Sequence, residues 1–260
     1  MLSLPQAENF VLSYPKTGRT WLRALIGAYL HVGRGLPETE LIGYRAWEAC
    51  GFPSTYFTHG QAGFADLIPW QALRPEGRIF AGRRVLLLVR DLRDTMVSAY
   101  FWANRRLGIF DGTMSAFLRD GSLGAEKFLA YYRGWYETRQ APRELLVVRY
   151  ERLHRDAAGT LAAVLRFLGE AQPDPAAIEA AVQYATFSNL RRIEQEGTIS
   201  LTDHNPGLGE ERWRRDDPEA TKVRRGVVGG YADYLGKEDL DWLAAQTARL
   251  GCPFTVYRPS

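Results

Sequence analysis

The chain has 260 residues, of which 46% are hydrophobic, and this is typical of one globular domain with a large buried core. Lys and Arg total 33 against 30 Asp and Glu, so the net charge of +3 is too small for a general polyanion binder. Any basic function must therefore be local. Nucleic acid is not an expected partner, and we expect residues 1–260 to form a single domain.

Cysteine content and hydropathy bear on the compartment. Cys50 and Cys252 lack the spacing of a metal site, and a thiol-poor chain is ordinary in a reducing environment. The sequence leaves a disulfide between them open. No window approaches the ~20 apolar residues that cross a bilayer, and no charged segment followed by an apolar run opens the chain. We expect a cytoplasmic protein with no membrane partner.

Short apolar runs alternate with segments of helical period, a pattern that favours an α/β fold with a mainly parallel central sheet. The predicted strands are Phe10–Tyr14, Tyr56–His59, Val85–Val89 and Leu145–Arg149. The predicted helices are Thr20–His31, Leu92–Arg105, Gly124–Arg139, Ala157–Leu168, Ala176–Tyr184 and Lys237–Leu250. The stretch Gly197–Ala220 mixes Gly, Pro and charge without apolar periodicity, which predicts a surface loop, either an ordered lid or a disordered segment.

The segment SYPKTGRTWLR, residues 13–23, runs from the first predicted strand into the first predicted helix. Lys16 to Arg19 then form a tight loop at a helix N-terminus, where free backbone N–H groups and the helix dipole attract an anion. Gly18 permits close approach of the main chain. We expect Thr20 to cap the helix and to offer its hydroxyl to a bound oxygen.

This loop is not the nucleotide P-loop GxxxxGK[ST], because its lysine precedes the glycine. The order Tyr-Pro-Lys-Thr-Gly-x-Thr-Trp instead resembles the 5′-phosphosulfate loop of sulfotransferases that use 3′-phosphoadenosine 5′-phosphosulfate (PAPS). The resemblance implies a P-loop-like three-layer fold with helices flanking the sheet. It also implies that adenosine 3′,5′-bisphosphate (PAP) is the product and that no metal is needed. The residues that it assigns to the 5′-phosphate end are Lys16, Thr17, Gly18, Arg19 and Thr20.

Two further segments resemble the 3′-phosphate elements of the same family. In LLLVRDLRDTMVSAYF, residues 86–101, Arg90 ends a strand and Ser98 follows on a helix. Arg offers a planar fork to phosphate oxygens, and a hydroxyl two turns along can reach another. In KVRRGVVGGY, residues 222–231, the matching positions are Arg224, Arg225 and Gly226. We interpret Arg93 and Asp94, between the matching residues, as solvated helix charges.

Adenine needs flat partners, and stacking on an aromatic ring is worth ~1 to 3 kcal/mol per base. Trp21, Tyr150 and Phe187 stand at positions that match aromatics of the family. Each of them can also be a core residue, since large aromatics are buried on average.

Sulfuryl transfer requires charge stabilisation on the departing phosphate and removal of a proton from the acceptor. The resemblance assigns Lys16 to the leaving oxygen. For the base we expect His59, at the end of a predicted strand, where the family carries Lys-Thr-His; here Phe57 replaces that lysine. His204, in the predicted loop, is the reserve, and His31 is interpreted as a helix C-terminal cap.

The acceptor is expected to be a small molecule with a hydroxyl, aromatic or glycosylated, or less readily an amine. The reason is a set of aromatics predicted to line a cleft near His59: Trp47, Phe52, Tyr56, Phe64, Trp70, Phe101, Trp102 and Phe110. Two alternatives stay open. A kinase would need a Walker lysine, which is absent, and a non-catalytic nucleotide-binding module would use the same Arg clusters. Oligomeric state is not indicated.

Overall fold

A computed structural model gives the structure of the chain and describes residues 5–197, 199, 217–251 and 253–255. Its centre is a parallel sheet with strand order β2-β1-β3-β4. The strands are β1 Asn9–Ser13, β2 Thr55–Thr58, β3 Arg84–Val89 and β4 Glu144–Arg149. Each strand begins one residue before its predicted range, and β1 and β2 also end one residue earlier than predicted, so the four predicted strands are confirmed.

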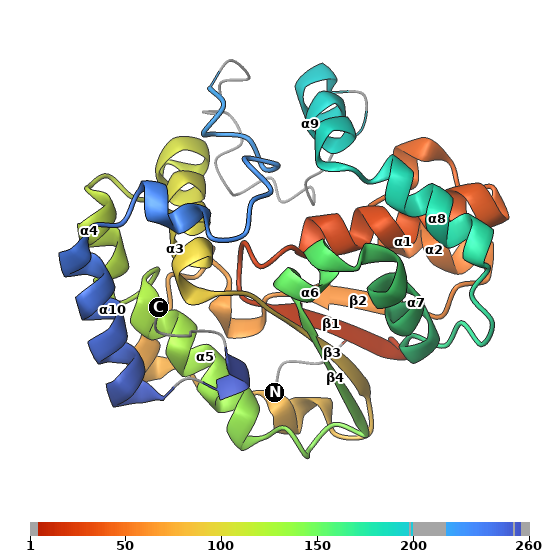
Figure 1. The fold of residues 1–260 in the computed structure, drawn as a ribbon. Helices are drawn as coiled ribbons and strands as arrows, with labels where there is room; N and C mark the ends of the chain where they lie inside the picture. The colour runs from red at the N-terminus through yellow and green to blue at the C-terminus, as the bar shows by residue number, and fades with distance from the viewer. Residues whose placement is uncertain (1–4, 198, 200–216, 252, 256–260) are drawn as a thin grey trace.

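Helices cover both faces of the sheet (Figure 1). They are α1 Arg19–Arg34, α2 Tyr44–Trp47, α3 Leu92–Phe101, α4 Met114–Leu118, α5 Ala125–Glu137, α6 Tyr150–Arg155, α7 Ala157–Phe167, α8 Pro175–Tyr184, α9 Phe187–Glu196 and α10 Lys237–Leu250. A π-helical turn, η6 Trp102–Leu107, continues α3, so the predicted helix Leu92–Arg105 is two segments. The short helices α2, α4 and α6 escaped prediction because a few residues carry too little periodicity, and α9 was also missed.

Alternating side chains of the strands feed two separate hydrophobic cores, as the period of a strand requires. On β1, Phe10 and Leu12 pack with α3, α4, α5 and α10, whereas Val11 packs with α1, α2 and α6 to α9. All three side chains are fully buried, as are most residues of β3. The fold is therefore a three-layer α/β fold, as predicted.

The register of the sheet decides where chemistry can occur. Ser13 pairs with Leu88, and Leu88 pairs with Val148, so β1, β3 and β4 end at nearly the same level. The residues that follow them, Tyr14, Arg90 and Tyr150, consequently meet at one edge, the carboxyl edge where α/β sheets bind ligands.

Some predictions fall outside the described residues or remain open. Most of Gly197–Ala220, His204 and Cys252 lie outside them, and Cys50 is a free thiol within them. In the described part of the chain, no helix combines the length and hydropathy that a membrane span needs.

Candidate active site

The β1–α1 loop turns sharply through two left-handed residues, Lys16 with φ 70° and Gly18 with φ 101°. The hydroxyl of Thr17 donates to the main-chain oxygen of Tyr14 at 2.8 Å and is fully buried. The helix begins at Arg19 with Gly18 as its N-cap residue and no side-chain cap, so the prediction that Thr20 caps it is wrong. Because Gly18 offers no side-chain acceptor to the first turn, the backbone N–H groups of that turn are available to an anion.

Gly18 is required at this turn for a steric reason. A Cβ there would lie 2.6 Å from Cδ2 of Tyr150, in a conformation that side chains rarely adopt. The Tyr150 ring also packs on Arg90, whose guanidinium carbon is 4.2 Å from the ring centroid. Arg90 donates from one NH to the main-chain oxygen of Lys16 at 3.1 Å. The loop after β1 and the residue after β3 are thus joined directly.

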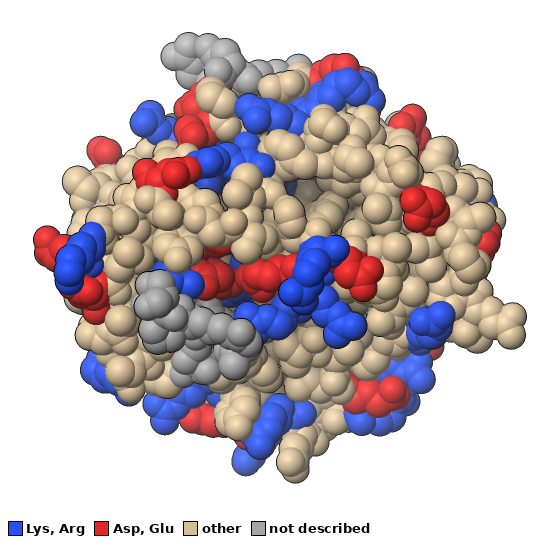
Figure 2. All heavy atoms as spheres, viewed as in Figure 1, with Lys and Arg blue, Asp and Glu red and all other residues tan. Residues whose placement is uncertain are grey.

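A cavity of about 530 Å³ opens at this edge. Figure 2 shows the surface hollowed there, between segment 217–229 and the start of α1, with basic side chains around the opening. Every predicted site residue except Thr17 lines it: Lys16, Gly18, Arg19, Thr20, Trp21, His59, Arg90, Ser98, Tyr150, Phe187, Arg224, Arg225 and Gly226. The side chain of Thr17 instead points into the protein, where it holds the loop.

Lys16 extends its ammonium into the part of the cavity bounded by Trp102. Its Nζ lies 4.2 Å from the centroid of the indole ring and 3.4 Å from the main-chain oxygen of Lys222. Burial, followed by the charges of Lys222 and Arg106, lowers the pKa of Lys16 well below 10.5. An anion bound beside Lys16 would oppose these effects and hold its proton in place.

His59 follows β2 and is fixed through Nδ1, which contacts both the hydroxyl of Ser13, at 3.3 Å, and the main-chain oxygen of the same residue. Its Nδ1 lies 2.7 Å from the main-chain oxygen of Ser13, which can only accept, so Nδ1 carries the proton. The other ring nitrogen, Nε2, then keeps a lone pair. Burial, and next the charge of Arg19, lower the pKa of His59 well below 6.5, so the imidazole is neutral at neutral pH. A neutral imidazole with a free lone pair is suited to accept a proton.

The basic loop, residues 224–226, is held in place by hydrogen bonds and ion pairs with neighbouring residues. Arg224 donates to Glu219 at 3.0 Å and to the Tyr234 hydroxyl at 2.8 Å, while Arg225 pairs with Asp233 at 2.7 Å. Both residues nonetheless line the cavity. These bonds fix where the two positive charges stand before any ligand arrives.

The aromatic residues predicted to hold a base gather beside the basic loop. The rings of Trp21 and Tyr150 meet edge to face, with centroids 5.7 Å apart, and Trp21 donates to the main-chain oxygen of Ala185 at 2.9 Å. Phe187 packs on Gly226, where a Cβ would come within 2.3 Å of its ring. The three rings therefore form flat walls next to the basic loop.

Comparison with known proteins decides the family. The family model described as Sulfotransferase domain matches residues 6–247. The chain belongs to the sulfotransferase family. It is accordingly a transferase that moves a sulfuryl group, and neither the kinase nor the non-catalytic binding module is favoured.

Individual sulfotransferases are distant relatives over most of their length. Cytosolic sulfotransferase 17 of Arabidopsis thaliana is 27% identical over 89% of this chain and 70% of its own. The 3-alpha-hydroxysteroid sulfotransferase of Cavia porcellus is 23% identical over 88% of this chain and 78% of its own. The crystal structure of mouse sulfotransferase SULT7A1 complexed with PAP has a TM-score of 0.60 at 18% identity, covering 95% of this chain and 85% of that one. The last comparison supports the shared fold.

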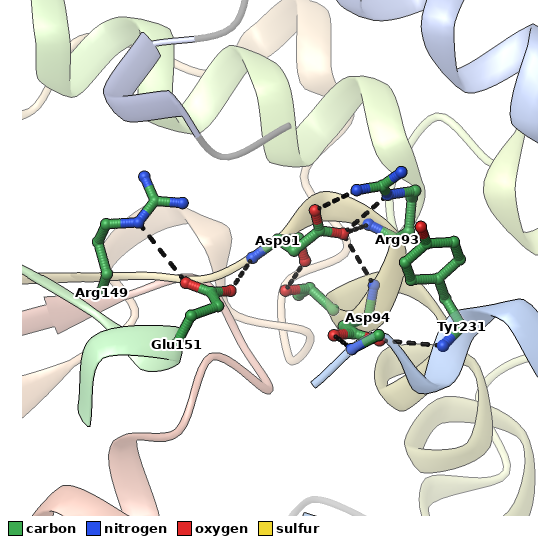
Figure 3. A network of polar contacts seen from close by, with 8 residues as sticks. Asp91, Arg93, Asp94, Arg149, Glu151 and Tyr231 are labelled. Atoms are coloured by element: carbon green, nitrogen blue, oxygen red, sulfur yellow. Dashed lines mark hydrogen bonds and ion pairs between the residues drawn. The ribbon is translucent and has the colours of Figure 1, made fainter. Parts of the chain in front are cut away.

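The interpretation of Arg93 and Asp94 as solvated charges is wrong for this sulfotransferase. Asp94 is 4% exposed and accepts from the main-chain nitrogens of Gly229, at 2.7 Å, and Tyr231, at 3.0 Å (Figure 3). Arg93 is likewise buried, with its guanidinium carbon 4.2 Å from the Tyr231 ring centroid. The donors to Asp94 lie far away in the sequence, where local pattern cannot reveal them, whereas Arg93 pairs with its neighbour Asp91 at 2.8 Å.

Further polar contacts connect the end of β4 to the start of α3 (Figure 3). Asp91 caps α3 by accepting from the nitrogen of Arg93 at 2.8 Å, and its own nitrogen donates to Glu151 at 2.7 Å. Glu151 in turn pairs with Arg149 at 3.7 Å. These bonds hold Asp91, the residue directly after Arg90, and so fix the segment that carries Arg90.

The predicted aromatic cleft is only partly right. Trp47 and Phe52 are buried in the core behind β1 and β2, and of the eight aromatics only Phe64 and Trp102 line the cavity. His31 lies inside α1, which continues to Arg34 and has Gly35 as its C-cap residue, although Nδ1 of His31 does contact the main-chain oxygen of Leu36 at 2.6 Å. Hydrophobicity alone cannot separate a core aromatic from a cavity wall.

Several cavity residues escaped sequence analysis, among them Lys222 and His154. His154 lies on α6 and donates from Nε2 to the main-chain oxygen of Gly226 at 2.8 Å. Lys222 is the first residue of the quoted basic segment, two residues before Arg224. That position was the one feature of the sequence from which its place in the cavity could have been predicted. Among the described residues, no group of three or more His, Cys, Asp or Glu could hold a metal ion.

Proposed function

We propose that this sulfotransferase takes its sulfuryl group from PAPS, releases PAP and sulfates a hydroxyl of a small molecule. The observation that carries the proposal is the hydrogen bond from Arg90 to the main-chain oxygen of Lys16, at 3.1 Å. It brings the two phosphate-binding segments to one cavity, as a nucleotide with phosphate at both ends requires. The cavity, of about 530 Å³, is in the range for such a ligand.

The donor set of the cavity fits PAPS. Lys16 and the N-terminus of α1 suit the 5′-phosphosulfate. Arg90, Ser98 and the Arg224–Gly226 loop suit the 3′-phosphate, and the rings of Trp21, Tyr150 and Phe187 suit adenine. The acidic residue Asp94 also lines the cavity, but its carboxylate already accepts two backbone N–H groups. The cavity therefore favours a ligand with several negative charges.

Bound PAPS would supply an activated sulfuryl group with a phosphate as leaving group. Lys16, held against Trp102, would then neutralise charge that develops on the leaving oxygen. His59 would accept the hydroxyl proton of the acceptor at Nε2, since its Nδ1 donates to Ser13. Because the pKa of His59 is lowered, the base form is already present at neutral pH.

The acceptor site is proposed beside His59, where Phe64 and Trp102 offer apolar walls. These walls support a small acceptor, aromatic or glycosylated, with a hydroxyl or less readily an amine. Two relatives are named cytosolic sulfotransferases, and on that ground we propose that this enzyme works in the cytoplasm. We also propose that residues 1–260 act as one domain.

Calorimetry with PAP tests the proposal. We expect micromolar binding without any metal ion, and weaker binding by ATP with magnesium. The reverse order of affinity would contradict the choice of donor. Transfer of label from radiolabelled PAPS to a panel of phenols and alcohols would then identify the acceptor class.

A further inference from the structure

Lys222 lines the cavity from segment 217–229. Hydrogen bonds fix its main chain, and they do not involve its side chain. Glu194 on α9 accepts from the nitrogen of Lys222 at 2.7 Å and from that of Val223 at 2.9 Å. The Glu194 carboxylate is itself buried and accepts from Arg106 at 2.6 Å. The position of the Lys222 main chain is therefore set by a buried ion pair.

The side chain of Lys222 shares one aromatic ring with Lys16. Their Nζ atoms lie 5.4 Å and 4.2 Å from the centroid of the Trp102 ring. In addition, the main-chain oxygen of Lys222 accepts from Nζ of Lys16 at 3.4 Å. Two ammonium groups are thus brought to the same wall of the cavity, close to the residue expected at the leaving oxygen.

The charge of Lys222 acts on both residues of the proposed chemistry. After burial, Lys222 is the largest cause that lowers the pKa of Lys16. It also contributes, with Arg19 and Lys16, to lowering the pKa of His59. Cations that repel one another in a partly buried site destabilise it until an anion binds between them. The cluster is accordingly arranged for an anionic group that lies between Lys16 and His59.

We propose that Lys222 is a catalytic residue that binds an oxygen of the sulfuryl group during transfer. The proposal rests on the proposed function, in which that group lies between Lys16 and His59. In the step, the acceptor oxygen forms a bond to sulfur while the bond from sulfur to the phosphate oxygen breaks, and that oxygen keeps the electron pair. The acceptor proton goes to Nε2 of His59, and Lys222 keeps its own proton throughout.

The neighbouring cations on this loop are less suited to that role. Arg224 and Arg225 pair with Glu219 and Asp233, and both also donate to the hydroxyl of Tyr234. Lys222 is the residue of this loop whose main chain contacts the ammonium of Lys16. The positive charges of this loop therefore serve two places. Lys222 lies near the proposed reacting groups, and the two arginines lie nearer the proposed site of the 3′-phosphate.

The test compares Lys222→Met and Lys222→Arg in the full chain. Transfer of label from PAPS to 2-naphthol, or to water if the phenol is not accepted, gives kcat, and calorimetry gives the affinity for PAP. We expect Lys222→Met to lower kcat by about 10²-fold, as for loss of one donor to a developing charge. Affinity for PAP, which lacks the sulfuryl group, should change less than threefold, and Lys222→Arg should restore part of kcat.

The pH profile is a readout that a merely structural role would not move. Three cations lower the pKa of His59, namely Arg19, Lys16 and Lys222, so Lys222→Met should shift the acid limb of kcat to higher pH. Lys237→Met, at an exposed lysine paired with Asp241 on α10, is the control and should match the wild type.

Two results would overturn the proposal: kcat of Lys222→Met within threefold of the wild type, or a loss of kcat matched by an equal loss of PAP affinity. The second would mean that Lys222 only shapes the loop. Failure of the wild type itself to bind PAP or to transfer label would instead contradict the proposed function.

Discussion

Arg90 and Lys16, separated by 74 residues in the sequence, are joined by a hydrogen bond of 3.1 Å from a guanidinium NH to a main-chain oxygen. Replacing Arg90 with Ala removes this link and a cation from the proposed 3′-phosphate site. We expect PAP affinity to fall about 10- to 100-fold, in line with the strength of hydrogen bonds to charged groups. Calorimetry measures it, with Arg133→Ala on the exposed face of α5 as control. An unchanged affinity would separate Arg90 from the nucleotide.

The pKa of Lys16 makes nucleotide binding depend on pH. Burial, Lys222 and Arg106 lower that pKa in the free protein, and a bound phosphate should raise it again. Below the lowered pKa, Lys16 is already charged and binding takes up no proton. Above it, binding takes up as much as one proton, and affinity falls as pH rises. Calorimetry of PAP in buffers of different ionisation enthalpy measures this uptake, which should vanish in Lys16→Met.

His59→Ala should abolish turnover, by about 10²- to 10⁴-fold as for loss of a general base, and leave PAP affinity nearly intact. His31→Ala, at a histidine that does not line the cavity, is the matched control. In the wild type, the pKa of His59 lies well below 6.5, so the base form persists and kcat should fall only at acid pH below that value. Normal turnover of His59→Ala would require another base.

Asp94→Asn tests the anchor of the loop that carries the basic residues. The carboxylate accepts from Gly229 and Tyr231 with separate oxygens, whereas an amide would turn an NH₂ group toward one of these donors. We expect a loss of about 1 to 3 kcal/mol in the free energy of unfolding, the cost of a buried unsatisfied group. Denaturation with urea measures this, and PAP affinity should fall in parallel. The exposed Asp241→Asn should change neither.

Much of this protein was determined by the sequence itself. A short apolar run rich in Val and Leu, such as Val85–Val89, is typical of a strand buried on both faces, which favours a parallel sheet. The anion-binding role of loop 16–20 could also be predicted from the sequence, because it depends on backbone N–H groups and on residues that are next to one another in the chain. The same holds for Arg90, whose place directly after a buried strand puts it at the carboxyl edge of the sheet.

Only the tertiary structure decided which distant groups share a site. Asp94 resembles a surface charge until the backbone of Gly229 and Tyr231 supplies its donors, and Trp47 resembles a cleft residue until it is found in the core. Lys222 stands beside Lys16 across 206 residues of chain. The pKa of each group and the function it can serve depend on such neighbours, because electrostatic and packing interactions follow distance in space, whereas sequence pattern records only distance along the chain.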